Sequence, residues 1–64
     1  MKNQGEKLYA IYKNGEHKGN QRGKSKIDVI RQYVIDSDFQ SFLNDIEFMQ
    51  QYKAIIAIEK IHYF

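Results

Sequence analysis

The segment from Asn14 to Asp28 gathers cationic side chains around glycines, a combination that suits a phosphate or a carboxylate ligand. It runs Asn-Gly-Glu-His-Lys-Gly-Asn-Gln-Arg-Gly-Lys-Ser-Lys-Ile-Asp. Glycine lets the backbone approach a ligand closely, and the free N–H groups at the start of a helix attract anions. The candidate contacts to a nucleic acid or another anion are Lys13, Lys18, Arg22, Lys24, Ser25, Lys26 and Arg31.

The charge distribution supports an anionic partner. Residues 1–31 carry a net charge of +5 and residues 32–64 a net charge of −3, which together give the overall +2. Such an asymmetry creates a basic face that steers anionic molecules toward a protein. Ordinary surface charge is the alternative interpretation, because every small domain must carry charge somewhere.

The sequence gives little indication of nucleotide binding, metal binding or catalysis. Gly19 and Gly23 resemble the glycines of a nucleotide-binding loop, but they are separated by three residues where that motif has four. His17 and His62 have no third metal ligand at a suitable spacing, and the chain contains no cysteine. A core of this size also leaves little room for a catalytic pocket. The sequence therefore predicts no enzyme activity, metal or cofactor.

Two tyrosines offer a possible platform for unpaired bases. Tyr9 and Tyr12 lie among lysines in one short segment, and aromatic rings interleaved with cations are typical of proteins that bind single-stranded nucleic acid. The alternative is that one ring belongs to the core while the other covers the sheet surface.

The elements that must position these residues follow from local patterns. Lys7–Lys13 is predicted to be a strand, and Asn14-Gly15 is a strong signal for a tight hairpin turn. The polar return strand, about Glu16–Gln21, should lie at a sheet edge. Ser25 is predicted to cap a helix that ends near Asp36.

The remaining sequence predicts a second helix and a last strand. A cap at Ser37 or Asp38 would begin the second helix, although a single bent helix is also compatible with the sequence, and Tyr52–Phe64 has the β-branched and aromatic content of a strand. The two expected apolar stripes are Ile27, Ile30, Tyr33 and Val34, then Phe39, Phe42, Leu43, Ile46 and Met49. The predicted fold is α+β, a β-β-α-α-β domain over residues 7–64 whose helices cover one face of a three-stranded sheet, after a flexible tail at 1–6.

Part of the chain resembles a known family. From Gly15 to Val34 a hairpin is followed by glycines, the Lys24-Ser25-Lys26 sequence and a helix, which is similar to the hairpin-helix part of double-stranded-RNA-binding domains. The resemblance implies that Lys24 and Lys26, with Arg31, contact phosphates across a groove. The chain departs from that family where Ile27 and Ile30 occupy positions that hold lysines there.

The whole chain also resembles, in style, the small orphan proteins of phages and mobile elements in AT-rich Gram-positive bacteria. It is short, free of cysteine, and rich in lysine, isoleucine and tyrosine. Proteins of that kind act by binding, which gives two hypotheses. The first is a nucleic-acid-binding accessory protein, and the alternative is an inhibitor or adaptor that binds an acidic protein surface and blocks a host enzyme or defence complex.

The last strand also suggests an interface. It is apolar on both faces, and two short helices cover only one face of a small sheet, so a homodimer is predicted to use Ile55, Ile61 and Tyr63. The alternative is that the second helix or the N-terminus covers the other face within one chain. The longest apolar run, Ala54–Ile58, is too short to span a membrane, and no signal peptide is recognised, so a cytoplasmic location is expected.

Overall fold

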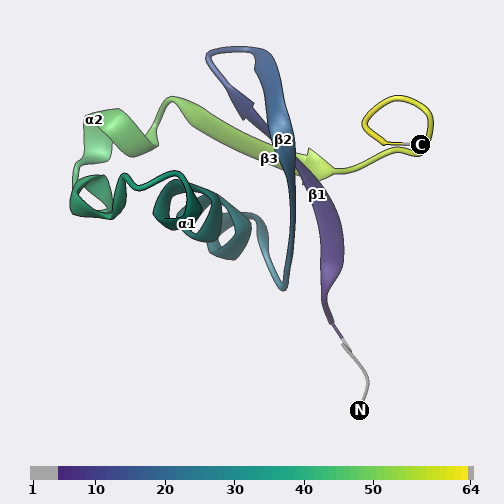
Figure 1. Cartoon of the computed structure of the whole chain (residues 1–64), viewed down its shortest axis with the longest axis horizontal. Helices are drawn as coiled ribbons and strands as arrows, with labels where there is room; N and C mark the ends of the chain where they lie inside the picture. The colour runs from purple at the N-terminus through teal and green to yellow at the C-terminus, as the bar shows by residue number, and fades with distance from the viewer. Residues whose placement is uncertain (1–4, 64) are drawn as a thin grey trace.

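The computed structural model describes residues 5–63 and confirms the predicted α+β fold (Figure 1). Residues 1–4 of the predicted tail, and Phe64 at the end of the predicted last strand, lie outside the described part. The elements are β1 (Lys7–Lys13), β2 (Glu16–Gly23), α1 (Lys26–Asp36), the 3₁₀ turn η1 (Gln40–Phe42), α2 (Ile46–Met49) and β3 (Tyr52–Ile56).

The three strands form an antiparallel sheet in the order β2-β1-β3, so the polar strand β2 lies at an edge as predicted. Asn14 and Gly15 have φ values of 53° and 85°, the left-handed pair that a two-residue hairpin turn requires. A bulge next to this turn leaves Lys18 without a partner on β1, because Ile11 pairs with Gly19 and Tyr12 with His17. Local chemistry therefore fixes the hairpin.

Helix α1 begins where the sequence predicts. Ser25 is its N-cap, and the Ser25 hydroxyl accepts a hydrogen bond from the backbone N–H of Asp28 at 3.1 Å. The Asp28 carboxylate in turn accepts the backbone N–H of Lys24 at 3.1 Å. This reciprocal arrangement satisfies two backbone donors at once and holds the turn between β2 and α1 in one conformation.

The core lies between α1 and one face of the sheet. It contains six buried side chains, which are Tyr9, Ile11, Val29, Val34, Tyr52 and Ala54. The predicted stripe of α1 requires a correction, because Val29 is fully buried whereas Ile27 is 72% exposed. Gly23 explains the rotation. A β-carbon at Gly23 would lie 2.6 Å from a Val29 methyl group, so the end of β2 lies directly against Val29 and turns Ile27 toward solvent.

The predicted second helix is replaced by two short pieces. Asp38 has a φ of 70°, and η1 ends before the Asp45 side chain caps α2 by accepting the Phe48 N–H at 3.0 Å. A capping carboxylate in the middle of the expected helix offers the backbone an alternative to continuous helix. The predicted stripe is consequently interrupted, and Phe39 and Phe42 remain about 40% exposed.

The last strand is shorter than predicted. After Ile56 the chain turns back on itself, and the Ile58 carbonyl accepts the N–H groups of Ile61 and His62 at 3.0 and 2.8 Å. Lys60 takes the left-handed conformation that this turn needs, with a φ of 72°. The C-terminal turn lies on the side of the sheet away from α1 (Figure 1). We call that side of the sheet the open face.

Candidate binding surfaces

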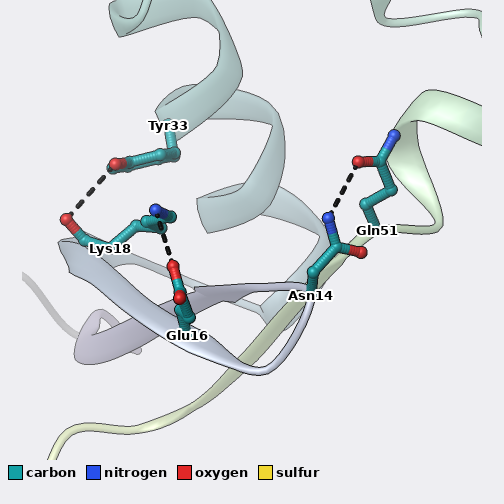
Figure 2. Close-up of polar contacts among 5 residues, drawn as sticks. All are labelled: Asn14, Glu16, Lys18, Tyr33 and Gln51. Carbon is teal, nitrogen blue, oxygen red and sulfur yellow. Dashed lines mark hydrogen bonds and ion pairs between the residues drawn. The ribbon is translucent and has the colours of Figure 1, made fainter.

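The structure spreads the predicted basic residues over several surfaces. Arg22, Lys24 and Lys26 are exposed around the turn between β2 and α1. Lys18 lies on the bulge of β2, where its ammonium group pairs with Glu16 at 3.1 Å and its carbonyl accepts the Tyr33 hydroxyl at 3.4 Å (Figure 2). An exposed pair such as Lys18–Glu16 contributes little stability, but it reduces the positive charge that Lys18 presents to an anion.

The start of α1 is partly occupied by the protein's own carboxylate. The Asp28 carboxylate accepts a hydrogen bond from the Lys24 N–H, and the Ser25 hydroxyl accepts one from the Asp28 N–H. Within this turn an arriving anion would meet the negative charge of Asp28. Any phosphate contact would therefore depend on the Lys24 and Lys26 side chains more than on backbone N–H groups.

Lys13 lies away from that turn. It projects over the rings of Phe48 and Tyr52, with its nitrogen 5.5 and 5.6 Å from the two ring centres, which is cation–π geometry. Burial raises the pKa of the Tyr52 hydroxyl, the neighbouring Tyr33 raises it further, and the charge of Lys18 acts in the opposite direction. The Tyr52 hydroxyl therefore stays neutral at physiological pH, so Lys13 contacts two uncharged rings.

The two candidate stacking tyrosines have different environments. Tyr9 is 7% exposed and belongs to the core, so it presents no free ring face to a base. Tyr12 is half-buried on the open face, where it contacts the rings of His17 and His62. This arrangement corresponds to the alternative interpretation, in which one ring is core and the other covers the sheet.

A polar network ties the C-terminal turn to the open face. The Tyr12 hydroxyl is 2.9 Å from Nε2 of His62, and Asn20 donates to the His62 carbonyl at 2.9 Å and accepts from His17 at 2.8 Å. Nδ1 of His62 accepts the Ile58 N–H at 2.8 Å, so Nε2 of the neutral ring carries the hydrogen. A metal at Nε2 would have to replace that hydrogen. No metal-binding group of three or more His, Cys, Asp or Glu side chains occurs in residues 5–63.

The predicted interface residues are exposed. Ile55, Ile61 and Tyr63 show 40%, 66% and 39% of their surface. The C-terminal turn covers part of the open face, where Ala10 is fully buried, but Ile55 borders a cavity of about 410 Å³. The cavity lies between the hairpin turn and the segment before β3, which are joined by a hydrogen bond of 3.2 Å from the Asn14 amide to Gln51 (Figure 2).

The sequence predicts core positions for several apolar residues that line cavities at the surface of the structure. A cavity of about 220 Å³ lies between α1 and the segment from η1 to α2. A second cavity, of about 410 Å³, lies on the segment 43–50 alone, and both have Leu43 and Met49 in their linings. We call them the α1–α2 groove, and its apolar residues with one cation are Ile27, Ile30, Arg31, Leu43, Ile46 and Met49.

Two apolar residues of this groove are strongly exposed. Ile27 on α1 and Ile46 on α2 each show 72% of their surface. The available sequence signal was a surplus of apolar residues: two helical stripes together exceed what one face of a small sheet can bury. That signal did not show which residues would remain outside.

Comparison with protein-family models, with curated protein sequences and with solved structures finds no match to this chain. Among the described residues, no helix has both the length and the apolar content needed to cross a membrane.

Proposed function

We propose that this chain is a non-enzymatic, cytoplasmic binding protein, an inhibitor or adaptor that grips another protein through the α1–α2 groove. The observation that carries the proposal is the exposure of Ile27 and Ile46, each 72%, in the linings of two cavities that share Leu43 and Met49. Exposed apolar side chains gathered in a depression are typical of sites that bind another protein, whereas scattered ones are not.

The chemistry of the groove indicates the kind of segment it would bind. Leu43 and Met49 line both of its cavities, and the flexible methionine side chain adapts to differently shaped partners. Arg31 is the one charged residue in its lining. A short amphipathic helix fits this surface, with apolar residues three and four positions apart and an acidic residue that reaches Arg31.

Selection from a random library of helical peptides tests this proposal. We expect the enriched peptides to carry that apolar spacing together with an acidic residue. Ile46→Lys should weaken binding of a selected peptide at least about tenfold, since a charge would have to be buried in the groove. Fluorescence titration of the labelled peptide measures the affinity, and circular dichroism checks that each variant is folded.

Ile61→Lys is the matched control, because Ile61 is similarly exposed, at 66%, but belongs to the C-terminal turn. Its affinity for the selected peptide should equal that of the unmodified protein. Arg31→Glu should shift the selection from acidic to basic peptides. Peptides that lose affinity with Ile61→Lys and keep it with Ile46→Lys would show that the groove is the wrong surface.

Nucleic-acid binding is the second candidate, and one observation favours it. Arg22, Lys24 and Lys26 are exposed around one turn, and the lone ion pair found within residues 5–63 is Lys18–Glu16. These cations are therefore available to phosphates. The resemblance of this hairpin and helix to double-stranded-RNA-binding domains implies phosphate contacts by two of these residues, Lys24 and Lys26, together with Arg31.

Titration against short single- and double-stranded DNA and RNA, at low and moderate salt, tests the second candidate. Replacing Lys18, Arg22, Lys24 and Lys26 by alanine should weaken binding to every sequence. It should also flatten the salt dependence by roughly 0.9 in slope for each phosphate contact that is lost. Lys53→Ala combined with Lys60→Ala removes cations elsewhere and should have little effect. If no nucleic acid binds at low salt, this candidate is wrong.

A further inference from the structure

Strand β3 lies at one edge of the sheet, and the backbone groups on its inner side form hydrogen bonds with β1. The Gln51 carbonyl accepts the Asn14 N–H and the Ala57 N–H donates to the Leu8 carbonyl, both at 2.9 Å. The N–H and C=O of one residue point to the same side of a strand, and the direction alternates from residue to residue. The odd-numbered residues from 51 to 57 therefore direct their backbone groups toward β1.

The even-numbered residues direct theirs outward. Tyr52, Ala54 and Ile56 thus present N–H and C=O groups along the outer side of β3, which we call the open β3 edge. None of these groups has a hydrogen-bond partner among residues 5–63. A flat edge with unpaired backbone groups is a template for another strand.

The fold defines the C-terminal end of this edge. Beyond Ile56, the Ile58 N–H donates a hydrogen bond to Nδ1 of His62. The Ile58 carbonyl accepts hydrogen bonds from the N–H groups of Ile61 and His62. The opposite edge of the sheet is protected by the bulge at Lys18. Of the two edges, the open β3 edge is the one without a bulge among the described residues.

We propose that the open β3 edge pairs with the same edge of a second copy of this chain, in antiparallel orientation, to form a continuous sheet with the order β2-β1-β3-β3-β1-β2. The outward positions are symmetric about Ala54. A two-fold axis at Ala54 sets Ala54 opposite its counterpart and Tyr52 opposite Ile56. Every outward N–H and C=O then faces an acceptor or a donor.

The side chains select the same register. Ile56 is 47% exposed in one chain, and this pairing places it opposite Tyr52 of the other. Lys53 falls opposite Ile55, whose exposed surface its aliphatic stem can cover. If the two-fold axis lay at Lys53 instead of Ala54, Lys53 would face Lys53 of the other chain, and the two like charges would repel each other. The surface involved is separate from the α1–α2 groove, so this inference does not depend on the proposed function.

Hydrogen exchange tests the pairing residue by residue. The Ala54 and Ile56 amides should exchange at least about tenfold more slowly at about 1 mM protein than at about 10 µM. The Lys53 and Ile55 amides, which face β1, should be protected at both concentrations. Sedimentation equilibrium over the same range should show a monomer–dimer transition. A protein that is monomeric throughout overturns the proposal, and so does a dimer whose Ala54 and Ile56 amides are unprotected.

Ala54→Pro removes one outward N–H without breaking the bonds to β1, and proline is tolerated on edge strands when its nitrogen faces outward. It should abolish the dimer while circular dichroism stays unchanged. If this variant does not fold, a synthetic chain with an N-methylated Ala54 tests the same bond with the side chain retained. Ile61 belongs to the interface predicted from the sequence, but it lies in the C-terminal turn outside the edge, so Ile61→Lys should dimerise normally. A dimer that persists in the folded Ala54 variants would contradict the pairing.

Discussion

Ile11→Ala is expected to leave the protein unfolded at room temperature. Ile11 is fully buried in the central strand, and its neighbours in the sheet are Gly19 on β2 and Ala54 on β3. Because both neighbours are small, they cannot move to fill the space that the isoleucine leaves. Such a truncation costs about 2–5 kcal/mol, which equals most of the ~3–5 kcal/mol that the core of so small a domain provides.

Urea denaturation followed by circular dichroism measures this effect. Ile61→Ala is the matched control, because Ile61 is 66% exposed, and its expected change is within about 0.5 kcal/mol. An Ile11→Ala protein that unfolds cooperatively at nearly the same urea concentration as the unmodified chain would show that the centre of the sheet packs differently.

Gly23→Ala should be the most damaging of the glycine substitutions. The new β-carbon would lie 2.6 Å from both a carboxylate oxygen of Asp28 and a methyl carbon of Val29. Val29 is fully buried and has little rotamer freedom in a helix, so the start of α1 would have to move. Overpacking of this kind costs about 1–3 kcal/mol, and displacing Asp28 weakens its bond to the Lys24 N–H as well.

Gly19→Ala provides the comparison, since its β-carbon would meet only the ring of Tyr33, at 3.2 Å, and that half-buried side chain can shift. Thermal melts of the two variants should therefore give a clearly lower midpoint for Gly23→Ala. Equal midpoints would mean that α1 can slide away from β2 without loss, which would contradict the close approach of Gly23 and Val29.

Local chemistry was sufficient to predict the first half of the molecule. The Asn14-Gly15 turn, the polar edge strand and the Ser25 cap each depend on residues that are neighbours in the sequence, and all three are confirmed. The order of the elements and the α+β fold followed from them. The basic residues Lys24 and Lys26 were also predicted to lie exposed at the start of α1, and they do.

The tertiary structure decided which apolar residues are covered. Helical spacing predicted Ile27 in the core, but the close approach of Gly23 to Val29 rotates α1 and leaves Ile27 in the groove wall. In the same way, Asp45 begins a separate short helix and leaves Ile46 exposed.

The C-terminal turn shows the same dependence on distant contacts. This turn is attached to the open face by His62, whose ring contacts the Tyr12 hydroxyl although the two residues are 50 positions apart in the sequence. The sequence alone determined where the chain bends and caps, because those choices are made among adjacent residues. Packing determined which apolar side chains stay exposed, because that depends on how elements far apart in the sequence approach each other.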